Sequence, residues 1–141
     1  MTDSGLLLYD HPVSSNALKV RYMLALLELD YERSHVPFAW PRPDHYTKLN
    51  PFGRIPTLID GDLVLSESNA ILRYLADREA CDDLYPRALR DRAKVDRAMD
   101  SWSTVVRPAL FPGENLGLIQ TGDWDAGGGR WEDAEDQEAL N

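Results

Sequence analysis

The clearest local pattern in the sequence is TLIDGDLVL at residues 57–65. It contains two apolar runs separated by Asp60 and Gly61, residue types that tolerate the positive φ angles of tight hairpin turns. The stretch therefore predicts a β-hairpin, so the sheet of this protein must include an antiparallel pair of strands.

Before this hairpin, the sequence predicts a strand followed by a helix. Residues 6–9 form a short, continuously apolar run, which is typical of a buried central strand. A turn signal at residues 10–12 ends that run. A helix then begins at Ser14 or Ser15, because a serine hydroxyl can cap a helix by accepting a backbone hydrogen bond, and it extends to about Glu28. One face of this helix is apolar and carries Val20, Leu24 and Leu27.

A second strand is predicted over residues 31–36, and the short connections favour a parallel pair of strands. A short helix follows at residues 44–49, and after the hairpin Ser66 caps another helix that ends near Arg78. The inward face of this last helix carries Ile71, Tyr74 and Leu75. The resulting order, βαβ-α-ββα, is that of a thioredoxin-like fold, an α/β protein with a mixed four-stranded sheet covered by helices.

The chain is predicted to continue into a second, helical region. Residues 1–80 form the α/β domain, residues 81–87 form a linker, and residues 88–141 are the start of an all-α domain that is incomplete. A long helix in this region should end or kink at Pro108, because proline lacks the N–H that a helix interior uses. Its apolar face carries Val95, Met99, Trp102 and Val106, and further helical segments are expected at residues 115–120 and 131–140.

The charge balance disfavours two classes of partner. The 141 residues include 15 Lys and Arg against 24 Asp and Glu, a net charge of −9. Nucleic acids and anionic membranes are themselves negative, so neither is an expected partner. Residues 121–141 alone contain seven acids and one arginine. We expect this acidic segment to face solvent and to be weakly ordered beyond Gly122.

Other sequence features also disfavour whole classes. No apolar run approaches the roughly 18–20 residues that a membrane span needs, and the N-terminus does not resemble a secretory signal. A cytoplasmic location is therefore expected. Cys81 is the single cysteine, so an intramolecular disulfide and a zinc cluster are excluded. No metal site is expected either, because no ligand spacing relates the three histidines, His11, His35 and His45.

Candidate chemistry begins at the N-terminus of the first predicted helix. Backbone N–H groups make that end positive, and such an end stabilises a thiolate. The position holds Ser14 and Ser15 but no cysteine, so dithiol exchange is excluded there. A serine hydroxyl could instead hydrogen-bond a thiolate carried by a ligand. The alternative interpretation is a plain helix cap.

Two later segments could contribute to the same site. X–Pro bonds are trans by default, but a cis bond before Pro56 would turn the Ile55 backbone towards the helix end, where it could pair with a peptide ligand. Glu67 and Ser68 lie at the start of the later helix. They could hold the ammonium and carboxylate groups of an α-amino acid, or they could simply cap that helix.

Several motifs occur together and in a characteristic order. They are HPVSS at residues 11–15, NPFG at 50–53, GRIPTL at 53–58 and SESNAILRYL at 66–75. In this order they strongly resemble the N-terminal domain of glutathione transferases, and most of all the branches that use a serine. The resemblance covers residues 5 to about 78, and residues 84–102 look like the start of that family's helical second domain.

The resemblance implies a role for individual residues. The activating hydroxyl falls on Ser14, with Ser15 as the alternative. Family members usually bind the glycyl carboxylate of glutathione just before the short second helix, which here is residues 39–42. Ile55, before a cis Pro56, would bind the backbone of the glutathione cysteine, and Glu67 and Ser68 would hold the γ-glutamyl end. Arg54 would add a further backbone or side-chain contact.

The function implied by the resemblance is conjugation of the glutathione thiolate to a small electrophile, in detoxification. Glutathione would be the co-substrate, and a homodimer is expected where the helical domain is complete. This chain is expected to stop short of the family's later helices. Three alternatives stay open: a non-enzymatic glutathione-binding or protein-interaction module, a glutathione-dependent peroxidase or isomerase, and a fragment whose site does not form.

Overall fold

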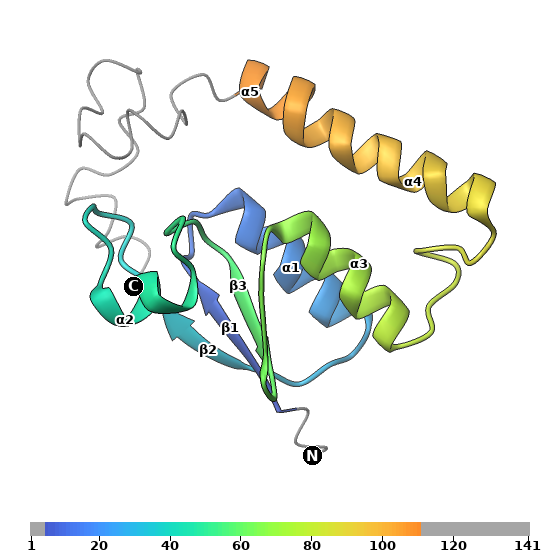
Figure 1. The fold of residues 1–141 in the computed structure, drawn as a ribbon. Helices are drawn as coiled ribbons and strands as arrows, with labels where there is room; N and C mark the ends of the chain where they lie inside the picture. Colours follow the sequence, from blue (N-terminus) through green and yellow to red (C-terminus); the bar gives the residue numbers. More distant parts are fainter. Residues whose placement is uncertain (1–4, 111–141) are drawn as a thin grey trace. The chain divides into compact units, whose positions relative to one another are not determined.

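The computed structural model describes residues 5–110 of the chain (Figure 1). Within this part, the α/β domain has the predicted order of elements. Its strands are β1 (Leu6–Asp10), β2 (Glu32–His35), β3 (Thr57–Asp60) and β4 (Leu63–Ser66), and its helices are α1 (Ser15–Leu26), α2 (Asp44–Leu49) and α3 (Ser68–Arg78).

The four strands form one mixed sheet in the order β2-β1-β3-β4. β1 and β2 are parallel, whereas β3 is antiparallel to both β1 and β4. Leu8, in the middle of β1, is paired with Arg33 of β2 and with Leu58 of β3. At the hairpin turn Gly61 adopts a φ of +58°, a left-handed conformation that glycine reaches without steric cost. The predicted mixed sheet and hairpin are therefore confirmed. The turn itself is one residue later than predicted, because Asp60 still pairs with Leu63 and the residues between the strands are Gly61 and Asp62.

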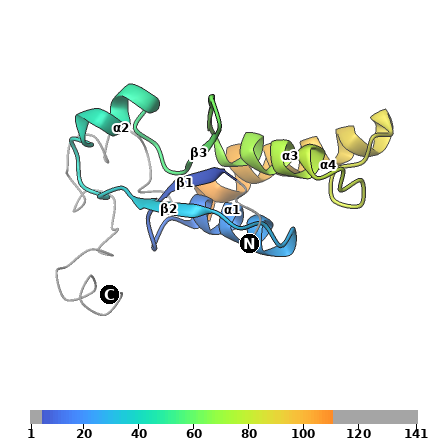
Figure 2. The ribbon, with the colours of Figure 1, turned by 90° about the horizontal axis from the view of Figure 1, so that it is seen from below.

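The two faces of the sheet are covered by different helices. Side chains alternate along a strand, so Leu6 and Leu8, both buried, point to one face and Tyr9 to the other. α1 and α3 lie side by side next to the sheet, and α2 lies apart from them (Figures 1 and 2). The ring of Tyr9 packs on that of Tyr46 in α2, with centroids 5.4 Å apart. The helices contribute Val20, Leu24, Ile71 and Leu75 to the core, all fully buried.

Two details of the helices differ from the sequence prediction. Ser66 does not cap α3, because it is the last residue of β4 and is paired with Thr57 in the sheet. The N-cap is Glu67, whose φ of +70° turns the chain from the strand into the helix without a side-chain capping bond. α1 ends at Leu26 rather than near Glu28, where the chain has already turned left-handed with a φ of +53°.

The described residues divide into two compact units, one of residues up to 38 and from 42 to 93, the other of residues 39–41 and from 94 onwards. All residues of helix α4 (Leu89–Ser101) are among the described ones, and none of them is buried. The predicted helical segments at residues 115–120 and 131–140, and the weak order expected beyond Gly122, lie outside the described residues. Among residues 5–110, the helices are too short or too polar to cross a membrane.

The predicted break at Pro108 takes an unexpected form. The chain stays helical past this proline, through a π-helical turn η1 (Trp102–Val106) and a short helix α5 (Arg107–Leu110). Proline removes an N–H and crowds the carbonyl four residues earlier, here that of Thr104. A π turn spaces its hydrogen bonds more widely than an α-helix. The α-helical pattern is therefore interrupted just before the proline instead of ending at it.

Candidate active site

The N-terminus of α1 is capped by the first of the two candidate serines. The Ser14 hydroxyl oxygen accepts a hydrogen bond from the backbone N–H of Ala17 at 3.2 Å. Because that oxygen serves as an acceptor towards the helix, its own proton remains available for donation to another group. Ser15 is the first residue of the helix and is half-buried.

A buried ion pair fixes the turn that leads to Ser14. Asp10 is only 1% exposed, and both of its carboxylate oxygens accept from Nη1 of Arg21, at 2.7 and 2.8 Å. Arg33 donates to the same carboxylate. Arg21 also donates to the backbone carbonyls of His11 and Pro12, at 3.3 and 3.1 Å. The guanidinium of Arg21 therefore ties the end of β1 to the turn before α1.

The Ile55–Pro56 bond is cis, as the resemblance implied and as proline alone would not have indicated. Ile55 belongs to the same buried cluster as Ala17 in the first turn of α1. Within residues 5–110, the backbone N–H and C=O of Ile55 have no hydrogen-bond partner. This short extended edge is therefore open to a ligand with a peptide backbone.

The N-terminus of α3 meets that of α1. Ser68 is buried, and its hydroxyl donates to Oδ1 of Asn16 at 3.3 Å. Lys19 makes a second link, since its Nζ donates to Oδ1 of Asn69 at 3.0 Å. Glu67 is exposed just before the helix. Two positive helix ends thus lie together, an arrangement that favours negatively charged groups of a ligand.

Arg54 lies beside this site with an exposed side chain, and no partner for its guanidinium is found among residues 5–110. Its backbone carbonyl is held from α2, because it accepts from the hydroxyl of Tyr46 and, at 2.8 Å, from Nδ2 of Asn50. The same two side chains contact the hydroxyl of Thr57, at 2.9 and 3.2 Å. The chain on either side of Ile55 is therefore fixed while Ile55 itself is left open.

The structure thus brings together the three segments that carry Ser14 and Ser15, residues 54–56, and Glu67 and Ser68: the start of α1, the loop before β3 and the start of α3. Residues 4–77 match the family model described as the glutathione S-transferase N-terminal domain. The chain belongs to this family. The match covers the three segments in full, so the resemblance read from the short motifs is confirmed.

Individual relatives agree with this membership. The chain is 38% identical to glutathione S-transferase Z1 of Arabidopsis thaliana over 127 residues, which is 85% of this chain and 55% of the relative. A theta class glutathione S-transferase from Xanthomonas axonopodis pv. citri, solved with glutathione bound, is 32% identical with a TM-score of 0.69, covering 97% and 67% of the two chains.

A glutathione transferase homologue from Drosophila mojavensis, also solved with glutathione bound, is 34% identical with a TM-score of 0.67. The matched region covers 72% of this chain and 48% of the homologue. The chain spans about half the length of the curated relatives that it matches.

His11, three residues before Ser14, is too weakly basic to act as an effective base for its hydroxyl. Burial, together with the nearby His35 and Arg42, lowers the pKa of His11 from 6.5 to about 4. The ring is therefore neutral at pH 7, and its Nδ1 accepts from the backbone N–H of Val13 at 3.3 Å. The rings of His11 and His35 are 5.0 Å apart, but no group of three metal-ligating side chains occurs in the part of the chain that the structure describes.

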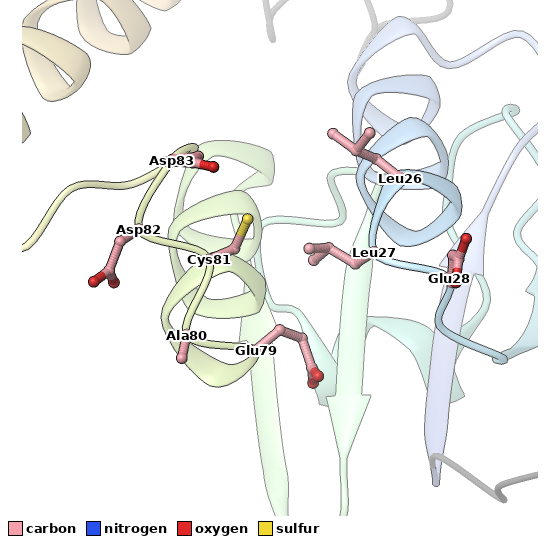
Figure 3. A pocket seen from close by; sticks show the side chains of 8 residues that line it. All are labelled: Leu26, Leu27, Glu28, Glu79, Ala80, Cys81, Asp82 and Asp83. Carbon is pink, nitrogen blue, oxygen red and sulfur yellow. The ribbon is translucent and has the colours of Figure 1, made fainter.

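A separate open cavity of about 580 Å³ lies at the opposite ends of α1 and α3, where both helices finish (Figure 3). Leu26 and Leu27 form one wall of this cavity, and the side chain of Cys81 points into the cavity. Its polar lining is acidic, with Glu28, Glu79, Asp82 and Asp83. Glutathione carries net negative charge, and like charges repel, so this cavity does not suit glutathione.

The sequence predictions missed the groups that support the site. Asp10, Arg21 and Asn16 were not singled out, because each acts through a partner that is distant along the chain. One signal was available for Asp10: an acid that directly follows a buried strand needs a cation nearby, because a buried charge is costly unless it is paired.

Proposed function

We propose that this chain binds glutathione where the starts of α1 and α3 meet the Ile55 edge, and that it conjugates the glutathione thiolate to a small electrophile. The observation that carries the proposal is the Ser14 hydroxyl. It caps α1 through its oxygen and keeps its proton for a ligand, next to a backbone edge without partners. The two relatives solved with glutathione bound support the same ligand.

In this proposal each part of glutathione meets one segment. The cysteine backbone pairs with the open N–H and C=O of Ile55. The γ-glutamyl end reaches the start of α3, where its carboxylate meets Ser68 and its ammonium meets Glu67, as favoured by the positive helix end and by opposite charge. Arg54 is an exposed cation and is available to the glycyl carboxylate.

The chemistry follows from stabilisation of the thiolate. A hydrogen bond to the charged form of an acid lowers its pKa, so donation from Ser14 to the sulfur raises the fraction of thiolate at pH 7. The thiol proton passes to water. The thiolate then forms a C–S bond with the electrophile, whose leaving group departs with the electron pair of the broken bond. Positioning and activation of the nucleophile are the contribution of the protein.

The proposal extends to the setting of the reaction. It includes the division into an α/β domain over residues 1–80, a linker over 81–87 and a helical domain from 88 onwards. It also includes a homodimer where that helical domain is complete, and a role in cytoplasmic detoxification. A non-enzymatic glutathione-binding module is distinguished by binding without turnover of any model electrophile.

The test compares Ser14→Ala, Ser14→Gly and Ser15→Ala in the 141-residue chain. Calorimetry measures the Kd for glutathione, conjugation of 1-chloro-2,4-dinitrobenzene measures turnover, and the ultraviolet absorbance of bound thiolate gives its pKa. Loss of one such donor should lower kcat by about 100-fold and raise the pKa of the bound thiol. The Kd should change by less than about threefold, which is under 1 kcal/mol.

Ser14→Gly is the matched control for the helix cap. Alanine at an N-cap costs about 0.5–2 kcal/mol, whereas glycine costs only a few tenths. If the hydroxyl matters for chemistry, both variants lose the same activity although their stabilities differ. Unchanged turnover in both would contradict the role of Ser14, and a loss confined to Ser15→Ala would transfer the role to Ser15. Failure of the wild-type chain to bind glutathione would refute the proposal as a whole.

A further inference from the structure

Arg42 is an unusual residue for the interior of this domain. It lies in the loop just before α2, and it is only 6% exposed. Arginine is almost never fully buried unless its charge and its donors are satisfied. One of its partners, the carbonyl of Gly53, lies two residues before Ile55.

The guanidinium of Arg42 joins two separate loops. Its Nε donates to the carbonyl of Gly53 at 3.0 Å, and its Nη1 donates to the carbonyl of Pro37. The guanidinium lies over the ring of Phe38, 5.2 Å from the ring centroid. A planar fork with donors in fixed directions is suited to bridge two carbonyls, so Arg42 sets the distance between the loop after β2 and the loop before β3.

The bridge acts two residues before Ile55. Gly53 adopts a φ of +63°, and its N–H donates to the carbonyl of Asn50 at 2.8 Å. The next carbonyl, that of Arg54, is held by Tyr46 and Asn50. The consecutive carbonyls of residues 53 and 54 are therefore both fixed by side chains from α2 or its ends. The direction of the following Ile55 edge is set by these bonds.

We propose that Arg42 is a positioning residue for glutathione: by holding the Gly53 carbonyl it orients the Ile55 backbone edge on which the ligand binds. The inference rests on the proposed function. Arg42 lies in the 39–42 loop, which the family resemblance associates with the glycyl carboxylate. The geometry assigns its guanidinium to the protein backbone, and Arg54 is left as the cation for the ligand.

The test uses two ligands that differ only at the glycyl end. Glutathione carries the glycyl carboxylate, whereas γ-glutamylcysteinamide ends at the cysteine without it. Calorimetry on the 141-residue chain compares the wild type with Arg42→Lys, which keeps the charge but loses the bridging fork. Arg54→Gln is the comparison for a direct carboxylate contact, and Arg90→Gln, at an exposed position on α4, is the control for charge alone.

For a positioning residue, Arg42→Lys should weaken both ligands by the same factor, about 5- to 20-fold, the range expected for loss of a well-placed hydrogen bond. In turnover, KM for glutathione should rise by that factor while kcat and the pKa of the bound thiol stay unchanged. Arg54→Gln should weaken glutathione alone, and Arg90→Gln should change neither Kd. Weakening of glutathione alone by Arg42→Lys would overturn the inference, because it would show a direct carboxylate contact. Unchanged affinity for both ligands would also overturn it.

A second measurement does not depend on ligand binding. In two-dimensional amide NMR of the free protein, Arg42→Lys should shift the signals of Gly53 and Ile55 but not that of Ser68. Unshifted signals of Gly53 and Ile55 would overturn the inference, whether or not the wild type binds glutathione. Failure of the wild type to bind glutathione would by itself count only against the proposed function. If Arg42→Lys does not fold, Phe38→Leu removes the ring under the guanidinium and should weaken both ligands equally, by about two- to fivefold. Equal affinities of Phe38→Leu and the wild type would then refute the positioning role.

Discussion

Replacement of Asp10 by asparagine should cost this domain a large share of its stability. The carboxylate is 1% exposed, and its main partner, the Arg21 side chain, is 17% exposed. Removing one partner of a buried ion pair costs about 3–5 kcal/mol, because the other charge stays buried without compensation. Arg21 keeps its hydrogen bonds to the carbonyls of His11 and Pro12, and an amide oxygen can still accept one bond. We therefore expect a loss of about 2–3 kcal/mol.

This loss is measurable by urea unfolding and by thermal unfolding at pH 7, each followed by far-ultraviolet circular dichroism. Each 1 kcal/mol lowers Tm by about 4–8 °C in a domain of this size, so Asp10→Asn should lower Tm by about 8–24 °C. Arg33→Gln is the matched control, because it removes a partner of the same carboxylate whose side chain is 50% exposed. Pairs of this kind contribute about 0–1 kcal/mol.

A second control addresses charge pairs in general. Asp82 pairs with Arg87 at 2.9 Å, and both side chains are more than half exposed, so Asp82→Asn should change stability by about 0.5 kcal/mol or less. If Asp10→Asn cost less than about 1 kcal/mol, or no more than Arg33→Gln, the ion pair would not anchor the turn before α1. Arg21 would then not hold the turn that leads to Ser14.

Two further perturbations test the environment of single residues. His11 has its pKa lowered to about 4 from 6.5, so between these values the unfolded chain binds a proton that the folded chain does not, and stability falls as the pH falls through this window. His11→Gln should remove about 1–2 kcal/mol of that loss, after discounting for partial exposure, when stability is measured by urea unfolding at pH 7 and at pH 4.5. The same loss of stability in His11→Gln as in the wild type would contradict the assignment. Gly61→Ala should cost about 1 kcal/mol of stability from backbone strain alone, because φ is +58° and an added Cβ would meet no atom within 4 Å. In the same unfolding assay, Gly61→Asn should be more stable than Gly61→Ala. An alanine variant as stable as the wild type would show that the turn relaxes.

The elements that sequence reasoning predicted are those specified by neighbouring residues. The hairpin depends on Gly61, with its positive φ, between two apolar runs, whereas Asp60 is the last residue of β3. The cap of α1 depends on Ser14, three residues before the amide that it binds. The error at Ser66 has the same origin. A serine before a helical pattern is a common cap, but pairing of Ser66 with Thr57 across the sheet extended the strand by one residue and moved the cap to Glu67.

The supports of the site could not be predicted from the sequence because their partners are distant along the chain. Ser68 binds Asn16, 52 residues away, and Asp10 binds Arg21 on the following helix. From the sequence alone, each of these polar side chains would be predicted to be an ordinary surface residue. Only the packing of α1 against α3, and of α1 behind β1, shows that they are paired.

The same pairing explains how the ligand-binding groups can stay open in a folded protein. A buried polar group without a partner is costly, yet the Ile55 backbone has no hydrogen-bond partner among residues 5–110 and the Ser14 oxygen only accepts a bond there. The cost is limited because the groups immediately behind them are satisfied: the Arg54 carbonyl by α2, the Ser14 oxygen by Ala17 and the Ser68 hydroxyl by Asn16. A site fixed in this way does not need to be ordered when its ligand arrives, and less of the binding energy is lost to immobilising side chains. If the proposed site binds glutathione, the supports behind it should therefore affect the affinity as well as the groups that would touch the ligand.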